Sequence, residues 1–442
     1  MILIWKSLWS RRRRNAWLMA ELVLVSVVCW VVFDPVIVMT YDRRMIPLGY
    51  DAHRLCMVSL AKLEPQSPGY EAAAEDSARV VDDYLNLVRM AAGFGGVERT
   101  TPVLGFVYPN SMGTLQTGYI PEHDSITCAM MGNCFLPHTG FFETYGFQPG
   151  PGRTLAELSD YPYGPGDLII SEETALFSFG TEHVQGKRFY EKQKRQDATG
   201  AEYVDTTYLS VVGTVGNFKQ HSYARPVPMV FEPILAIDVT DIPTDARILI
   251  RLKEGVSMDC FLHDFRPWMV SRLKAGNLYA RGVQSYDGLI AEEERAVSDP
   301  IYYRNLSLAF FFLINLCLGV LGTFWLQTRT RREEVGIMLS FGATPGRIVR
   351  QLMGEGMLLT FCASVVGSLL YLSYAWNEGF SNGTSESYLN TVSTYWVDDF
   401  AWHFWVVSFI ILLILWAVVL LGIYLPARNI SRVQPTEALR DE

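Results

Sequence analysis

Apolar residues concentrate in four long runs, near residues 16–39, 305–327, 352–375 and 402–425. A helix rises about 1.5 Å per residue, so about 20 apolar residues cross the roughly 30 Å of hydrocarbon in a bilayer. Each run is long enough, and the segment Trp405–Leu421 carries no charge, whereas core helices of soluble proteins keep a polar face. The pattern predicts an α-helical membrane protein with four transmembrane helices, at residues 16–40, 304–327, 349–375 and 402–425.

The first run differs from a cleavable signal peptide. Its apolar stretch is longer than a signal h-region, and no small-residue cleavage pattern follows it. The run contains two acids, Glu21 and Asp34, near its opposite ends. We expect both side chains to reach interfacial water there, so that neither need mark an ion pathway.

The distribution of basic residues predicts the orientation, because cytoplasmic segments of membrane proteins are enriched in Lys and Arg. Basic residues cluster in the N-terminal segment 1–15, in the link 328–348 and in the tail 426–442, whereas the loop 376–401 contains none. We therefore expect a multi-pass protein of the bacterial inner membrane. Both termini and the link are cytoplasmic in this interpretation, and the loop and the large segment 41–303 are periplasmic.

The segment 41–303 is long enough to fold as a large domain. Its residues 41–300 carry 23 Lys and Arg against 34 Asp and Glu, an acidic balance that argues against nucleic acid as a partner. Strand and helix patterns alternate along it, which indicates an α+β periplasmic domain inserted between the first and second transmembrane helices. Residues 100–165 lack a sustained period and are interpreted as an inserted lobe of loops and short strands. The clearest patterns are strands at His53–Lys62, Asp167–Ser171, Tyr208–Val215, Met229–Phe231 and Ala246–Leu252, and helices at Asp76–Met90, Glu172–Phe179, Ser257–Ala275 and Asp287–Asp299.

No catalytic pattern stands out. A phosphate-binding loop needs Gly-x-x-x-x-Gly-Lys-Ser/Thr, and the nearest string, Gly180 to Arg188, has the wrong spacing. The histidines and acids are scattered without a recognisable nucleophile and base. We expect a chain that is not an enzyme, has no catalytic residues and binds no cofactor itself, so that ATP and Mg²⁺ belong to a partner subunit.

Two cysteines of the periplasmic segment, Cys128 and Cys134, face an oxidising compartment and close a short loop, which makes them a candidate disulfide. With His123 and His138 they also offer four metal ligands within a short stretch. The gap between the cysteines is wider than in a zinc-finger hairpin, so we expect no metal site.

The link between the second and third runs has a distinctive pattern. Glu333–Phe341 reads as a short helix that exposes apolar surface, Gly342 ends it, and Thr344 with Pro345 begins the next helix as N-cap and first residue. The composition fits two structures: a hairpin at the lipid surface, or a knob that docks in a groove of a partner protein. The apolar residues concerned are Val335, Met338, Leu339 and Phe341.

This link resembles the coupling helix of the macrolide-exporter (MacB)/FtsX family of ABC-transporter permeases, whose pattern is Arg-Arg-Glu-Ile-Gly-x-x-x-Ala-x-Gly-Ala followed by a helix ending in Glu. Glu333 departs from it by replacing a basic residue. The tail from Leu425 to Arg440 is similar to the family's closing Pro-Ala-Arg…Pro-x-Glu-Ala-Leu-Arg, and three segments resemble its MacB-like periplasmic core domain: 169–177, 186–187 and 211–218. The matching link residues are Glu334, Val335, Gly336, Gly342, Ala343 and Glu355.

The resemblance implies a permease subunit of an ABC transporter, which converts ATP hydrolysis by a separate ATPase subunit into periplasmic movement (mechanotransmission). It implies efflux or export of drugs, peptides or lipid-linked substrates. The expected partners are a second permease copy or a sister permease and the membrane lipid around the helices. Some members of the family also work with a periplasmic adaptor and an outer-membrane channel. The ATPase-coupling residues would be Glu334, Val335, Gly336, Met338, Leu339, Phe341, Gly342, Ala343, Thr344 and Pro345.

Other functions remain open at this point. Within the family, the alternatives are a permease that releases lipoproteins and an FtsX-like activator of cell-wall hydrolases at division. Outside it, the chain would be a membrane-anchored binding or sensory protein without an ATPase, in which the basic, apolar link has no evident purpose.

Overall fold

The computed structural model describes residues 12–105, 107–111, 113, 115–196, 202–242, 246–329, 332–381, 383 and 395–431. The chain divides into two compact units. We call the first the helical unit, which comprises residues 1–41, 300–383 and 393–442. We call the second the α/β unit, which comprises residues 42–299 and 384–392.

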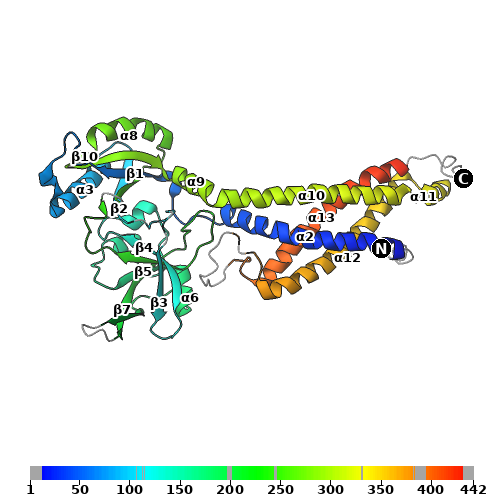
Figure 1. Cartoon of the computed structure of the whole chain (residues 1–442), viewed down its shortest axis with the longest axis horizontal. Helices are drawn as coiled ribbons and strands as arrows, with labels where there is room; N and C mark the ends of the chain where they lie inside the picture. Colours follow the sequence, from blue (N-terminus) through cyan, green and yellow to red (C-terminus); the bar gives the residue numbers. More distant parts are fainter. Residues whose placement is uncertain are drawn as a thin grey trace. The chain divides into compact units, whose positions relative to one another are not determined.

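Within the described residues, four helices are long and apolar enough to cross a membrane, as the apolar runs predict. The helices α2 and α10 lie side by side in the helical unit (Figure 1), where the Thr323 hydroxyl donates to Glu21 at 3.2 Å. Both continue past this unit, because α2 ends at Arg44 and α10 begins at Ser298. The helices are α2 (Arg12–Arg44), α10 (Ser298–Arg329), α12 (Pro345–Glu378) and α13 (Phe400–Ile430), with the short α11 (Arg332–Ser340) between α10 and α12.

Small residues allow the helices to pack closely. A Cβ atom at Gly356 of α12 would lie 2.1 Å from the Ile423 side chain of α13, and one at Gly367 would lie 2.5 Å from Ser26 of α2. Close backbone approach through small residues is a main source of helix association in membranes, where lipid tails are as apolar as the side chains. Both glycines therefore fix how α12 meets its neighbours.

The α/β unit contains a five-stranded antiparallel sheet with the order β10-β11-β1-β9-β2. Two helices, α3 (Ser77–Ala92) and α8 (Met258–Arg272), pack on one face, and Asp76 caps α3 by accepting from the Arg79 amide. These helices and the strand at the start of the unit confirm the sequence patterns. The strands are β1 (Leu55–Lys62), β2 (Val97–Val103), β9 (Arg247–Leu252), β10 (Lys274–Ala275) and β11 (Leu278–Ser285).

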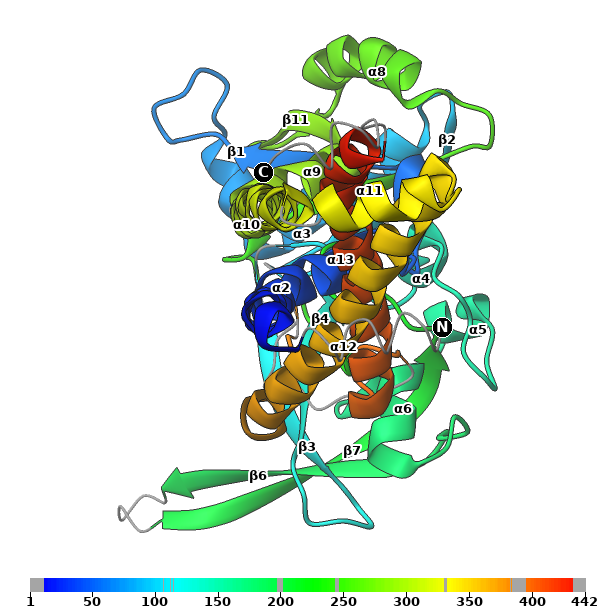
Figure 2. The same ribbon diagram turned by 90° about the vertical axis from the view of Figure 1, so that its right-hand side faces the viewer.

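A closed barrel with the order β3-β4-β8-β5-β7-β6 forms the other part of the α/β unit. The ribbon of β6 and β7 extends away from the rest of the barrel (Figure 2). Short helices complete the unit: η1 (Ala52–Arg54), η2 (Ala72–Glu75), α4 (Phe141–Tyr145), α5 (Leu155–Ser159), α6 (Glu172–Phe179) and α9 (Tyr286–Ala296). The barrel strands are β3 (Leu115–Pro121), β4 (Cys128–Phe135), β5 (Asp167–Ser171), β6 (Arg188–Gln196), β7 (Glu202–Val215) and β8 (Met229–Pro233).

The interpretation of residues 100–165 as an inserted lobe is wrong. β2 belongs to the five-stranded sheet, whereas β3 and β4 belong to the barrel and pair with β6 and β8. The pairing partners lie far away in sequence, so no local period marks them. One core of buried residues joins the two parts: Leu55 and Met57 of β1 pack in the same cluster as Phe231 of β8.

Candidate coupling site

The link between α10 and α12 folds as a short helix followed by a sharp turn. Gly342 has a φ of +83°, a left-handed conformation that favours glycine. The amides of Gly342 and Ala343 donate to the carbonyls of Leu339 and Met338, each at 3.0 Å, and so close the end of α11. Thr344 then takes the N-cap position of α12, as predicted, although its hydroxyl makes no capping bond there.

The apolar side chains of α11 face in two directions. Val335 is 4% exposed and lies in the core of the helical unit, against which Met338 and Leu339 pack. The expectation that Val335 exposes apolar surface is therefore wrong, and Met338 and Leu339 are half-buried. Residues three and four apart share one helix face, which here turns inward. Phe341, at 87% exposed, and Ile337, at 47%, form the exposed surface, which we call the knob.

The remaining residues proposed for ATPase coupling lie around the knob. Glu334 and Ala343 are half-buried, Gly336 is buried, and Gly342, Thr344 and Pro345 are exposed. Contact with an ATPase stays a prediction for all of them. An exposed phenylalanine on a short, basic link fits a protein contact better than a structural role within the chain, because a ring that is 87% exposed adds little to the packing of the described residues.

A second polar site lies in the α/β unit, where the last turn of α2, the end of α9 and the first turn of α10 meet the loop 216–228. The loop joins β7 to β8, and nearly all of its residues are buried. We call this group of charged and polar side chains the connector clamp. Its members are Asp42, Arg43, Lys219, His221, Ser222, Arg225, Glu293, Glu294 and Asp299.

Asp42 is the centre of one half of the connector clamp. The Nη1 atom of Arg225 lies 3.1 and 3.2 Å from its two carboxylate oxygens, and both residues are buried. The Lys219 ammonium donates to the Asp42 carbonyl at 2.5 Å and to the Ser222 carbonyl at 3.1 Å. Burial lowers the pKa of Lys219 to about 8, because desolvation outweighs the opposing effect of Asp42 and Glu294.

The other half of the connector clamp involves the end of α9 and the start of α10. Arg43 lies 2.9 Å from both Glu294 and Asp299. The Ser222 hydroxyl donates to Glu294 at 2.6 Å. His221 meets the buried Glu293 at 2.5 Å. The loop therefore holds both chain connections at once, and removing one partner of such buried pairs typically costs about 3–5 kcal/mol.

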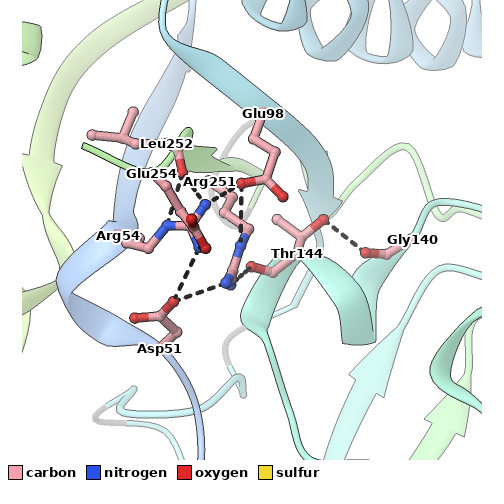
Figure 3. A network of polar contacts seen from close by, with 8 residues as sticks. All are labelled: Asp51, Arg54, Glu98, Gly140, Thr144, Arg251, Leu252 and Glu254. Atoms are coloured by element: carbon pink, nitrogen blue, oxygen red, sulfur yellow. Dashed lines mark hydrogen bonds and ion pairs between the residues drawn. The ribbon is translucent and has the colours of Figure 1, made fainter. Parts of the chain in front are cut away.

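A third polar network surrounds two arginines between the sheet and α4 (Figure 3). Arg251 lies 2.8 Å from Asp51 and donates to the Thr144 carbonyl at 3.2 Å. Arg54 donates to the Leu252 carbonyl and pairs with Glu98, which also lies 3.8 Å from Arg251. Because these partners come from the strands β2 and β9, from α4 and from the chain before η1, we assign the network to holding the sheet and the α4 region together.

The prediction of a disulfide between Cys128 and Cys134 is wrong, and both are free thiols. They lie near opposite ends of the same extended strand, β4. Six residues at about 3.3 Å each separate them by roughly 20 Å, whereas a disulfide needs Cα atoms within about 7 Å. Among the described residues, no three His, Cys, Asp or Glu side chains form a group suited to a metal ion.

Sequence reasoning missed the connector clamp and misjudged Asp34. The clamp joins three segments that are far apart in the chain, and neither spacing nor composition links them. Asp34 is fully buried and bonds to His403, so the expectation that it reaches interfacial water is wrong. The His403 ring and the Ser381 amide bond to the Asp34 carboxylate in place of water. The one available signal was the presence of a carboxylate and a histidine within apolar helices.

Comparisons with known proteins bear on the helical unit most directly. Residues 306–435 match the family model described as FtsX-like permease C-terminal. A relative is the macrolide export ATP-binding/permease protein MacB of Vibrio parahaemolyticus serotype O3:K6 (strain RIMD 2210633), 28% identical over 125 residues. The alignment covers 28% of this chain and 16% of that protein.

Two solved structures are similar to parts of the chain. The periplasmic region of MacB from Actinobacillus actinomycetemcomitans is 10% identical, with 56% of this chain and 94% of that one covered and a TM-score of 0.30. The extracellular domain of the noncanonic ABC-type transporter YknZ from Gram-positive bacteria is 12% identical, with 51% and 100% covered and a TM-score of 0.26. TM-scores this low do not establish a common fold. The family match and the MacB relative confirm the resemblance to permeases of the MacB/FtsX type found in the sequence.

Proposed function

We propose that the chain is the permease subunit of an ABC transporter that converts ATP hydrolysis by a separate ATPase subunit into movement of its α/β unit. The observation that carries this proposal is the knob, since Phe341 is 87% exposed on the link that lies within the family match. The chain itself is not an enzyme and holds no nucleotide in this proposal. ATP and Mg²⁺ bind to the partner.

The two ends of the α/β unit supply the transmission. Asp42 and Arg43 lie in the last turn of α2, and Asp299 lies in the first turn of α10. All three belong to the connector clamp. A tilt of α2 therefore pulls on the loop 216–228 through the buried Asp42–Arg225 pair, and α10 is tied to α2 through the Arg43–Asp299 pair. Surface pairs contribute about 0–1 kcal/mol and would yield under load. Buried pairs of this kind make a stiff connection.

The proposed setting follows from the family and from the charges of the link. The chain resides in the bacterial inner membrane with both termini cytoplasmic and its α/β unit in the periplasm. It pairs with a second permease copy or a sister permease on two ATPase subunits. The relative's name, a macrolide export protein, supports efflux or export as the outcome.

The experiment is a cross-link between two permease copies. Engineered cysteine pairs that join the two α/β units should abolish transport while ATP binding by the ATPase stays intact. Reduction of the cross-link should restore transport. Normal transport by the cross-linked dimer would contradict the proposal and favour a conduit through the helices.

A further inference from the structure

The helix α10 is the least buried of the four long helices. In its most apolar stretch 12% of the residues are buried, against between 39% and 44% for α2, α12 and α13. One side of α10 packs within the helical unit, where Leu316 is buried and Thr323 bonds to Glu21. The opposite side faces away from the described parts of the chain.

The exposed side of α10 carries residues at alternating intervals of three and four. This is the heptad spacing with which two helices pack along a common line, because an average of 3.5 residues per turn keeps the same side chains facing the partner helix. We call this line the α10 seam, and at about 1.5 Å per residue it is about 26 Å long. Its residues are Leu308, Phe311, Asn315, Leu318, Gly322 and Trp325, and all of them are exposed.

The α10 seam has one strongly polar residue, Asn315, and it lies near the middle of the span. Tyr303 and Trp325 are exposed aromatic residues towards the two ends of α10, of the kind that lie at the interfaces between lipid and water. Asn315 is twelve residues from Tyr303 and ten from Trp325. These separations are about 18 Å and 15 Å along the helix, which places Asn315 near the centre of the hydrocarbon.

The Asn315 amide is only partly bonded. Its Nδ2 atom donates to the Phe311 carbonyl, one turn earlier in α10, at 2.8 Å. Within the described residues, its second N–H and its carbonyl oxygen make no hydrogen bond. Lipid tails offer neither a donor nor an acceptor, so these two groups need a polar partner on another helix.

The exposed faces of α12 and α13 differ from the α10 seam. Where side chains are described, every exposed residue is apolar over residues 361–370 of α12 and 405–421 of α13. Lipid tails cover such faces without loss of a hydrogen bond. The exposed amide therefore distinguishes the α10 seam from a face that only lipid covers.

We infer that the α10 seam binds the same seam of a second copy of this chain, with the two Asn315 amides bonded to each other. A two-fold axis along the membrane normal places each seam residue opposite its own counterpart. An amide has both donors and an acceptor, so two identical amides satisfy each other, whereas two like charges would repel. A single asparagine in an otherwise apolar seam also fixes the register and the number of helices.

Gly322 gives the second copy room to approach. A Cβ atom at this position would meet no atom of the chain within 4 Å, so the space beside Gly322 is open. Small residues at such positions let the backbones of two membrane helices come close. The inference specifies the pairing of two permease copies in the proposed function and rests on that pairing, but not on the ATPase or on transport.

The test measures self-association of the full-length chain in liposomes without an ATPase. A donor or an acceptor dye is attached to the exposed Cys260, and energy transfer between chains is followed as added lipid dilutes the protein. Phe311→Ala and Phe310→Ala form a matched pair of variants. Their rings are 60% and 59% exposed, but only Phe311 lies on the α10 seam.

Phe311→Ala should raise the dissociation constant of the dimer about tenfold, whereas Phe310→Ala should leave it unchanged. Asn315→Leu should raise it about three- to tenfold, because it removes the bond between the two amides. Asn315→Gln keeps an amide and should lose less affinity than Asn315→Leu. Gly322→Ile should weaken the dimer as strongly as Phe311→Ala, because the added side chain obstructs only the second copy.

Equal effects of Phe311→Ala and Phe310→Ala would overturn the inference, and so would unchanged affinity in Asn315→Leu and Gly322→Ile. A dimer that no seam variant weakens would show that the second copy binds elsewhere. In that case the inference falls, while the pairing in the proposed function stands. A wild-type chain that stays monomeric at every dilution would contradict both the inference and the pairing of identical copies, and would leave a sister permease as the partner.

Discussion

Soluble parts of proteins usually bury apolar side chains and expose charged ones, and the knob and the connector clamp each depart from one half of that rule. The knob places an apolar ring on the surface, with Phe341 87% exposed. The clamp places charges in the interior, with Asp42 at 0%, Lys219 at 1% and Arg225 at 5% exposure. Exposed apolar surface is satisfied only by something outside the chain, whereas buried charges are satisfied here by one another.

The two sites should therefore matter under different conditions. The connector clamp has its partners within one unit, so it should stabilise the isolated chain. The knob contributes almost nothing to the fold and should be noticed only when an ATPase is present. Stability measurements and binding measurements should therefore respond to different residues.

The largest effect is expected from Asp42→Ala. Removal of the carboxylate breaks the buried ion pair between Asp42 and Arg225, which should lower the free energy of unfolding of the α/β unit by about 3–5 kcal/mol. Chemical unfolding of the full chain, followed by proteolysis of the α/β unit, measures this. Arg79→Ala is the matched control. It breaks a pair with Glu71 in which both side chains are about half exposed, at a cost below about 1 kcal/mol.

If Asp42→Ala lowers the free energy of unfolding by no more than Arg79→Ala does, the connector clamp is not a stabilising site. The double variant Asp42→Leu with Arg225→Met should recover much of the stability, because apolar residues of similar volume avoid the cost of burying charge. Failure to recover would mean that shape, and not charge pairing, holds this loop.

Lys219 should make stability depend on pH. Its folded pKa of about 8 lies below the ordinary value of 10.5, so between these pH values the unfolded chain binds more protons than the folded one. Stability therefore rises with pH through this window, by up to roughly 3 kcal/mol. The Lys219→Met variant should lack this rise. The difference between the two unfolding curves measures it, and parallel curves would contradict the lowered pKa.

Phe341→Asp should weaken binding of the ATPase subunit by about 30-fold, or ~2 kcal/mol, without changing the stability of the chain. Ile337→Asp should act in the same direction with a smaller effect, because that side chain is less exposed. Phe341→Leu serves as the conservative control. Titration of the ATPase against chains in nanodiscs gives the affinities, and unchanged binding would place the knob against lipid.

Reducing agent should have no effect on stability. Cys128 and Cys134 lie far apart on β4, so no disulfide joins them. Unfolding midpoints with and without a thiol reductant should coincide, and peptide mass spectrometry should find both thiols free. A reduction-sensitive midpoint would mean that β4 is not extended between them.

Local patterns predicted the parts of this molecule that depend on neighbours in sequence. The apolar runs predicted four long helices, and Gly342 with Thr344 and Pro345 predicted the turn between α11 and α12. Patterns failed where distant segments meet. The pairing of β3 and β4 with later strands, the connector clamp and the Asp34–His403 contact all depend on residues about 70 or more positions apart.

The inward turn of Val335 was missed for a different reason. Helical period shows which residues share a face of α11, but not which face meets the rest of the protein. Both faces of this short helix carry apolar residues, so composition could not assign the exposed one. Packing against the core of the helical unit decides which face is buried, and it leaves Ile337 and Phe341 exposed.

The most direct test of the transmission account is a distance measured between the α/β units of two permease copies in complex with their ATPase. A spin label on the exposed Cys260 of α8 reports this distance by pulsed electron resonance. Addition of ATP should shift the distance distribution in the wild-type complex and leave it unchanged with Phe341→Asp. An identical distribution with and without ATP in the wild type, under conditions where the complex transports, would contradict the account.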